Sequence, residues 1–259
     1  MDLGLKGKKI IVTGGARGIG GAISDCLYEE GAIPIIIDRD EEASTKKLEN
    51  LSLDPGTYFF FADLSLPKNC QKVAEEILAK HPSIDGLVNN AGVNDAIGLE
   101  KGNPAKFLES LQINLVQVYS ITHYLLPRLK MSSGPIVNIG SKTAVTGQGG
   151  TSGYVAAKGG LLGLTREWAV ELLPYHIRVN TVVPAEVFTP LYEHYLNTFP
   201  DPAEALKKVE DKIPLERRMT TPKEIADMAV FLLSERSSHT TGQILFVDGG
   251  YTHLDRAVL

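Results

Sequence analysis

Short, continuous apolar runs alternate with helical patterns along the whole chain, and this alternation limits the possible fold more than any other feature. Strand-length runs occur at residues 9–13, 33–38, 57–62, 84–89, 135–139, 177–183 and 243–247. Because their residues are apolar without alternation, they predict strands buried on both faces. Helices are predicted at residues 19–30, 41–51, 68–80, 104–131, 154–173 and 222–234. The pattern predicts an α/β fold: one domain over residues 1–259, with a doubly wound, seven-stranded parallel sheet covered by helices on both faces.

Residues 185–214 are the one long stretch without a clear helix or strand pattern, and they carry most of the late aromatic residues and prolines. An insertion of this length between a strand and a helix is usually a lid or a binding loop. A substrate-binding lid is therefore predicted at about residues 185–214.

Composition excludes several classes of protein. The chain is 43% hydrophobic and 22% charged, which is ordinary globular usage, and its net charge of −5 provides no general attraction to nucleic acid or to anionic membranes. No apolar run is long enough to cross a bilayer, and the first residues lack a secretory signal pattern. Cys26, Cys70 and the six histidines show no metal-ligand spacing. We expect an intracellular, cytoplasmic protein with reduced thiols and no metal.

A glycine-rich segment after the first predicted strand indicates a nucleotide site. Residues 13–20 read TGGARGIG, with Gly14, Gly18 and Gly20 directly before a predicted helix. Glycine permits a tight turn and the close approach of a pyrophosphate, and the helix start supplies free N–H groups at the positive end of its dipole. The alternative is a purely structural turn, but the strand–turn–helix context favours dinucleotide binding.

Acidic residues follow the second and third predicted strands. Asp38 lies 18 residues after Gly20, where a carboxylate can accept hydrogen bonds from the adenosine ribose hydroxyls and repel a 2′-phosphate. Asp38 therefore favours NAD over NADP, although Arg17 or Arg39 could face a 2′-phosphate. Asp63 is a second candidate, and its alternative role is to cap the following helix.

With these turns in place, the chain resembles the short-chain dehydrogenase/reductase family over nearly its whole length. The further matching motifs, in order, are Asp63-Leu64, Asn89-Asn90-Ala91-Gly92, Asn114, Ser141, Tyr154 with Lys158, Arg178-Val179-Asn180 and Val247-Asp248-Gly249-Gly250. The resemblance implies a Rossmann fold and hydride transfer between a nicotinamide cofactor and a secondary alcohol or carbonyl compound. It implies a catalytic tetrad of Asn114, Ser141, Tyr154 and Lys158.

The resemblance also implies a set of cofactor contacts, with the turn after the fourth predicted strand under the adenine-ribose side. One departure is visible: Pro184-Ala185 stands where the family usually has Pro-Gly, and alanine restricts φ where glycine does not. Together with the motif residues already described, the expected cofactor contacts are Gly14, Arg17, Gly18, Ile19, Gly20, Asp38, Asp63, Leu64, Asn90, Ala91, Gly92, Tyr154, Lys158, Val187 and Thr189.

The spacing of Tyr154 and Lys158 suits acid–base chemistry. They are four residues apart on a predicted helix and so share one face. A nearby ammonium favours the phenolate, so we expect Lys158 to lower the pKa of Tyr154, which would act as general base or acid. Ser141 would hold the substrate oxygen and hydrogen-bond the phenolate. By resemblance, Lys158 binds the nicotinamide ribose and Asn114 holds a water. Taken singly, each of these residues has a structural alternative. Tyr154 and Lys158 could be a packing pair on the helix surface, Ser141 could be a loop hydroxyl, and Asn114 could mark a helix kink.

The residues expected near the reactive centre are polar. Gln148, Glu186 and Tyr192 are predicted to bind the substrate together with Ser141 and Tyr154. A polyhydroxylated substrate needs several fixed hydrogen-bonding groups, because unpaired ones are costly to bury. The alternative is that most of these side chains face solvent.

Residues 188–192 and 250–259 resemble the sugar-dehydrogenase branch of the family, its L-fucose dehydrogenase-like members in particular. The implied reaction is oxidation of an aldose at C1 to its lactone with NAD. The alternatives are reduction of 3-oxoacyl thioesters and hydroxysteroid oxidoreduction. A protein that senses NAD without chemistry is disfavoured, because both Tyr154 and Lys158 are present.

Apolar residues on the predicted helices 104–131 and 154–173 suggest subunit contacts. The family resemblance implies a homotetramer built on these helices, and the alternative is that the sheet covers these faces entirely. Asp255 and Arg256 are candidates to reach a neighbouring subunit.

Overall fold

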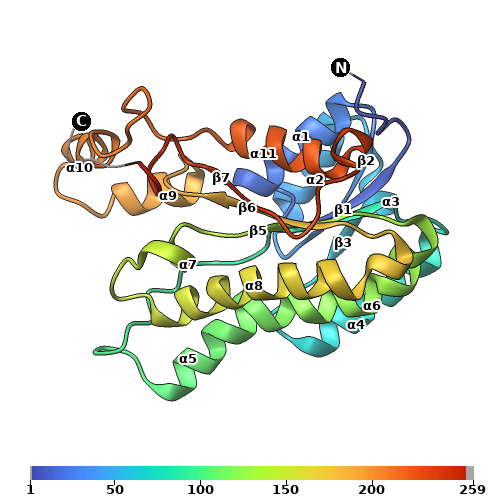
Figure 1. Cartoon of the computed structure of the whole chain (residues 1–259), viewed down its shortest axis with the longest axis horizontal. Helices are drawn as coiled ribbons and strands as arrows, with labels where there is room; N and C mark the ends of the chain where they lie inside the picture. The colour runs from blue at the N-terminus through green and yellow to red at the C-terminus, as the bar shows by residue number, and fades with distance from the viewer. Residues whose placement is uncertain (1, 255–259) are drawn as a thin grey trace.

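A seven-stranded parallel sheet forms the centre of the computed structural model, which describes residues 2–254 (Figure 1). The strand order is β3-β2-β1-β4-β5-β6-β7, so the chain builds one half of the sheet outward from β1 and then crosses to build the other. This confirms the predicted doubly wound sheet. The strands are β1 (Lys9–Thr13), β2 (Ile33–Asp38), β3 (Phe59–Phe61), β4 (Gly86–Asn89), β5 (Ile136–Ile139), β6 (Val179–Pro184) and β7 (Ile244–Val247).

Helices cover both faces of the sheet, as predicted. On one face lie α1 (Gly18–Glu29), α2 (Glu41–Asn50) and α11 (Pro222–Leu233); on the other lie α4 (Pro67–Lys80), α5 (Pro104–Leu111), α6 (Gln117–Ser132) and α8 (Ser152–Glu171). Among the described residues, no helix is both long enough and apolar enough to cross a membrane.

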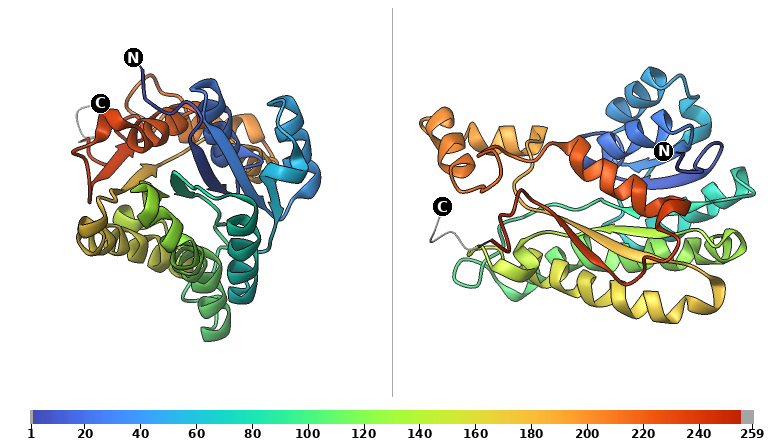
Figure 2. Two further views of the ribbon diagram at one scale, coloured as in Figure 1. Left: turned by 90° about the vertical axis from the view of Figure 1, so that its right-hand side faces the viewer. Right: turned by 45° about the horizontal axis from the view of Figure 1, so that its top comes forward.

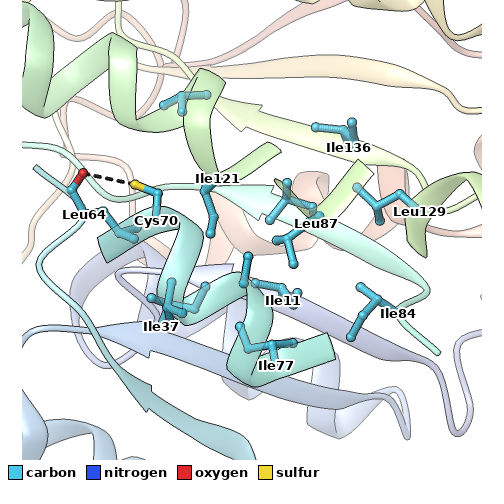
Figure 3. Packing of buried hydrophobic residues seen from close by; sticks show 14 of the residues in the cluster. Ile11, Ile37, Leu64, Cys70, Ile77, Ile84, Leu87, Ile121, Leu129 and Ile136 are labelled. Carbon is cyan, nitrogen blue, oxygen red and sulfur yellow. Dashed lines mark hydrogen bonds between the residues drawn. The ribbon is translucent and has the colours of Figure 1, made fainter. Parts of the chain in front are cut away.

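The sheet separates two apolar cores. One joins the strands to α4, α6 and α8, and Figure 3 shows Ile11, Leu87 and Ile136 from three neighbouring strands packed with residues of these helices. The other joins the strands to α1 and α11. Each large aliphatic side chain that is fully buried contributes about 1.5–3 kcal/mol to folding. These cores explain why both faces of the strands are apolar in the sequence.

The third strand begins later than predicted. The strand predicted over residues 57–62 is wrong at its start, because α3 (Pro55–Tyr58) precedes β3. Asp54 caps this short helix by accepting hydrogen bonds from the Gly56 N–H and the Thr57 hydroxyl, and Pro55 occupies its first position. Proline and an acidic cap both favour a helix start.

The long helix predicted over residues 104–131 is interrupted by a π-helical segment, Gln112–Val116, between α5 and α6. The side chain of Asn114 lies inside this segment and donates a hydrogen bond from Nδ2 to the Ser110 carbonyl at 3.1 Å. A π-helical turn inside an α-helix is frequent at functional sites.

The absence of regular structure predicted over residues 185–214 is wrong. This region contains α9 (Pro190–Leu196) and α10 (Pro202–Glu210), capped by Thr189 and Asp201 and each begun by a proline. Both helices project from the same end of the sheet (Figures 1 and 2). The remaining short helices are α7 (Thr143–Thr146), η2 (Leu173–Tyr175) and η3 (Glu235–Ser237). Asp255 and Arg256 lie outside the described residues.

Candidate active site

A cavity of about 680 Å³ opens where the carboxyl ends of the central strands meet. The strand order reverses between β1 and β4, and the cavity lies at this point. Such a switch point is the usual ligand position in a doubly wound sheet. Of the residues predicted from sequence, those that line it are Gly14, Arg17, Gly18, Ile19, Asp38, Asp63, Leu64, Asn90, Ala91, Gly92, Ser141, Tyr154, Lys158, Val187, Thr189 and Tyr192. Gly20, Asn114, Gln148 and Glu186 are not part of its wall.

The glycine turn has the shape that a pyrophosphate requires. Gly14 and Gly18 have φ of +63° and +56°, in the left-handed region that favours glycine. A Cβ atom on Gly20 would lie 2.1 Å from the Gly14 carbonyl oxygen, so Gly20 allows the turn to pack against α1. The helix begins without a side-chain cap, which leaves N–H groups of its first turn for a ligand. This arrangement fits the phosphates of a dinucleotide.

Asp38 lines the cavity and also braces the glycine turn. Its Oδ2 accepts a hydrogen bond from the Ala16 N–H at 3.2 Å, and its Oδ1 accepts one from the Asp40 N–H at 3.1 Å. Arg17 pairs with Asp40 at 2.9 Å, so its guanidinium is held by a carboxylate. Arg39 lines the cavity and is exposed. Asp38 thus lies at the cavity together with two exposed arginines, Arg17 and Arg39.

Asp63 does not cap the following helix, so that alternative interpretation is wrong. Helix α4 has Leu66 at its N-cap, with no side-chain cap. The Asp63 carboxylate instead accepts a hydrogen bond from the Ser65 N–H at 3.0 Å and lines the cavity.

Thr13 joins the two turns that meet at the cavity, a role the sequence analysis missed. Its Oγ1 accepts hydrogen bonds from the N–H groups of Asn90 and Ala91 at 3.0 and 3.1 Å. Asn90 Nδ2 in turn donates to the carbonyls of Thr13 and Gly14 at 3.0 and 3.1 Å. Thr13 could have been found from the sequence, because it is a hydroxyl residue at the end of the strand, directly before the glycines.

The predicted tetrad comes together at the end of the cavity nearest β5. Ser141 follows β5, Tyr154 lies in the first turn of α8, and their hydroxyls are hydrogen-bonded. Buried Lys158 lies one helical turn later; its Nζ donates to the Ile139 carbonyl at 2.7 Å and lies 5.7 Å from the centroid of the Tyr154 ring.

Asn114 lies behind this group. Its Oδ1 accepts a hydrogen bond from the Val93 N–H at 2.8 Å. A Cβ atom on Gly92 would lie 2.9 Å from Asn114 Oδ1 and 3.7 Å from Lys158 Nζ, so these three residues converge. That Asn114 holds a water stays a prediction.

The charge balance at Tyr154 differs from the sequence prediction. Burial raises the pKa of Tyr154, the hydrogen bond with Ser141 opposes this rise, and the Asp95 carboxylate adds to it. Burial also lowers the pKa of Lys158 to about 8. The expectation that Lys158 lowers the pKa of Tyr154 is therefore wrong for the protein alone. Desolvation disfavours the charged forms of both groups, and the ammonium is bound to a carbonyl.

Asp95 is an electrostatic neighbour of Tyr154, and it lies in the Asn94-Asp95 segment that is expected from the sequence to be near the reactive centre. It is half-buried, and its loop is anchored beside Tyr154 because the Gly153 N–H donates to the Ile97 carbonyl at 3.1 Å.

We expect Asp95→Asn to lower the pKa of Tyr154, because a negative charge near the phenolate is removed. In the oxidation direction kcat/KM rises as Tyr154 deprotonates, so its acid limb moves to lower pH. The pH profile of kcat/KM measures this. Glu100→Gln, which removes an exposed carboxylate from the same loop, is the control. An equal shift in both variants, or none in Asp95→Asn, contradicts the prediction.

The predicted substrate residues divide into two groups. Tyr192 lines the cavity beside His194, and burial raises the pKa of Tyr192 to about 12. Gln148 instead lies in an exposed turn, and Glu186 forms a buried ion pair with Lys142. The structure does not bring Gln148 or Glu186 into the cavity wall.

Ala185, the departure from the family pattern, is accommodated without strain. It lines the cavity, and its φ is outside the left-handed region where alanine is disfavoured. The glycine usual in the family is therefore not required for the backbone conformation at this position.

Comparison with known proteins places these features in one family. A family model described as "Enoyl-(Acyl carrier protein) reductase" matches residues 14–252. The chain is 36% identical over 245 residues to L-fucose dehydrogenase of Bos taurus, covering 94% of this chain and 89% of that protein. It is 34% identical over 252 residues to the 3-oxoacyl-(acyl-carrier-protein) reductase FabG of Thermotoga maritima, covering 95% and 98%.

Solved structures agree with these matches. The crystal structure of Cj0485 dehydrogenase superimposes with a TM-score of 0.93 at 46% identity, covering 99% of this chain and 98% of that one. Ligand-free aldohexose dehydrogenase of Thermoplasma acidophilum superimposes with a TM-score of 0.85 at 29% identity, covering 99% and 98%. The protein is an oxidoreductase that uses a nicotinamide cofactor and acts on a small molecule. The chain belongs to the short-chain dehydrogenase/reductase family.

Proposed function

We propose that the protein oxidises a neutral aldose at C1 to its lactone, with NAD as the hydride acceptor. The observation that carries this proposal is the meeting of Ser141, Tyr154 and Lys158 with the glycine turn in one cavity. The hydroxyls of Tyr154, Ser141 and Tyr192, with His194, give its wall polar groups that suit a polyhydroxylated substrate. Similarity to L-fucose dehydrogenase and to aldohexose dehydrogenase supports a sugar.

Each residue has a defined part in this reaction. Ser141 holds the C1 oxygen, and Tyr154 removes the proton from the C1 hydroxyl. The bound nicotinamide supplies the acceptor for the hydride that leaves C1. Lys158 provides a buried ammonium near the phenol and would hold the nicotinamide ribose of the cofactor. Loss of one proton and one hydride converts the aldose to the lactone.

A panel of substrates tests this assignment. We expect neutral aldoses to be oxidised with NAD and to give a lactone product. The second candidate, reduction of a 3-oxoacyl thioester, is favoured by the similarity to FabG. Turnover of a 3-oxoacyl thioester with no turnover of any aldose would replace the sugar proposal with this one.

Asp38 is the proposed basis for the choice of NAD. We expect Asp38→Asn to raise the KM for NAD by about 10- to 100-fold, because a hydrogen bond from a ribose hydroxyl to a carboxylate contributes about 1.5–3 kcal/mol. The KM for NADP should fall relative to that for NAD, since a negative charge is removed. Steady-state kinetics with both cofactors measures this. Glu41→Gln, an exposed acid at the start of α2, is the control. An unchanged ratio of the two KM values in Asp38→Asn rejects this role.

We further propose that α9 and α10 form a lid over the substrate end of the cavity. Helix α9 contributes Tyr192 and His194 to the cavity wall, and both helices project beyond the sheet (Figure 2).

A homotetramer is the proposed assembly. Leu161 and Trp168 of α8, and Leu172 directly after it, are buried in the core beneath the sheet, so the sheet covers that part of the predicted apolar face. Other apolar side chains of α6 and α8 stay exposed: Tyr119, Met131 and Val170. Sedimentation equilibrium tests the assembly, and a monomer at micromolar concentration contradicts it.

A further inference from the structure

We propose that the buried ion pair between Lys142 and Glu186 is a positioning clamp that ties the ends of β5 and β6 together and holds Ser141 against Tyr154. This inference rests on the roles proposed above for Ser141 and Tyr154. It does not depend on which alcohol or carbonyl compound is the substrate.

The first half of the clamp lies next to Ser141. Lys142 follows Ser141 in the chain, and its Nζ donates to Glu186 Oε1. The backbone N–H of Lys142 donates to the Pro184 carbonyl at 2.9 Å. The backbone hydrogen bond therefore joins the segment after β5 to the end of β6, and the ion pair joins it to the loop that follows β6. Displacement of the segment after β5 from this end of β6 would break both.

The second half of the clamp, Glu186, lies in a segment that forms part of the cavity wall. Glu186 stands between Ala185 and Val187, which both line the cavity. Its carbonyl accepts a hydrogen bond from the Thr220 N–H at 3.0 Å, which anchors it to the segment before α11. Glu186 thus connects a wall of the cavity to the body of the protein.

Tyr251 adds a third element. Lys142 Nζ lies 4.0 Å from the centroid of the Tyr251 ring, within the range of a cation–π interaction. The ammonium of Lys142 is therefore held between the loop after β6 and the segment after β7.

Burial sets this pair apart from the others. The side chains of Lys142 and Glu186 are 10% and 15% exposed. In every other ion pair found within residues 2–254, at least one side chain is 42% exposed or more. A buried pair adds little net stability, but replacement of Lys142 by an apolar residue leaves the buried Glu186 carboxylate as an uncompensated charge. Its geometry is therefore strongly constrained, which suits a positioning role.

The link to catalysis is the hydrogen bond between Ser141 and Tyr154. The charged group that acts on Tyr154 is Asp95, from the loop after β4. Lys158 Nζ of α8 lies 5.7 Å from the centroid of the Tyr154 ring, and the Ser141 hydroxyl faces Tyr154 from the end of β5. Burial and Asp95 raise the pKa of Tyr154, and the bond with Ser141 opposes this rise. Movement of Ser141 away from the phenol would remove the opposing effect.

The test compares Glu186→Gln, Lys142→Met and the double variant with the wild type, on whichever substrate the wild type turns over. Misplacement of Ser141 by about 1 Å should lower kcat by about 100-fold in each single variant. The acid limb of kcat/KM for oxidation should move to higher pH. If the two residues act as one unit, the double variant loses about as much as either single variant.

Asp25→Asn is the matched control, because it breaks the Lys47–Asp25 ion pair between α1 and α2, away from Ser141. Circular dichroism at the assay temperature checks that each variant is folded. If Glu186→Gln does not fold, Glu186→Asp replaces it and should retain the pH profile while losing less kcat.

Three results would overturn the clamp: a loss of kcat no greater than in Asp25→Asn, multiplicative losses in the double variant, or an unmoved acid limb. Failure of the aldose proposal is separate, since it is read from the wild-type substrate panel alone.

Discussion

We expect phenylalanine in place of Tyr154 to abolish turnover and to leave cofactor binding nearly intact. The ring keeps its packing in the first turn of α8, whereas the hydroxyl that meets Ser141 is lost. General acid–base catalysis contributes about 10²- to 10⁴-fold, so kcat should fall by at least that range. Initial rates measure the loss, and titration with NAD followed by fluorescence measures binding.

Tyr195→Phe is the control for this substitution, because Tyr195 is an exposed tyrosine on α9. Its kcat should be close to that of the wild type. Unchanged turnover in Tyr154→Phe would remove Tyr154 from the reaction and with it the proposed mechanism.

Alanine in place of Gly20 should abolish cofactor binding and destabilise the fold. The new Cβ would lie 2.1 Å from the Gly14 carbonyl oxygen and 2.4 Å from Asn90 Nδ2. Because the first of these contacts is backbone, it is relieved only if the glycine turn moves away from α1. Overpacking of a tight site costs about 1–3 kcal/mol, and the displaced turn can no longer approach a pyrophosphate.

Calorimetry of NAD binding and thermal unfolding measure the two effects of Gly20→Ala separately. Gly56→Ala is the matched control: this exposed glycine of α3 has a Cβ position whose nearest neighbour is the Asp54 side chain at 3.5 Å. It should bind NAD as the wild type does. Wild-type affinity in Gly20→Ala would show that the turn tolerates a side chain and does not contact phosphate closely.

The sheet and the glycine turn follow from local patterns. The bounds of β1 and β2 agree with the prediction because Ile10–Val12 and Ile35–Ile37 are buried on both faces, and such burial requires an uninterrupted apolar run. The glycine spacing is equally local, since a left-handed φ and close packing act on single residues. The tetrad residues were identified by resemblance, because no local pattern indicates that Ser141 meets Tyr154.

Short helices were harder to predict. Helices α9 and α10 have 7 and 9 residues, too few for a clear apolar period. The Thr-Pro and Asp-Pro dipeptides at their N-termini are typical of helix starts, but such dipeptides also begin turns. Packing at the end of the sheet decides between the two outcomes.

The sequence by itself determined the order of strands and helices, the position of the phosphate-binding turn and the set of chemical groups available. The tertiary structure alone decided where those groups act. Glu186 pairs with Lys142 outside the cavity wall. Asp95 lies near enough to Tyr154 to act on it electrostatically, and burial raises the pKa of the Tyr154 phenol. The physical reason is the distance along the chain over which each interaction acts. Burial patterns and backbone conformation depend on near neighbours in the chain, whereas ion pairs and desolvation depend on residues brought together only by folding.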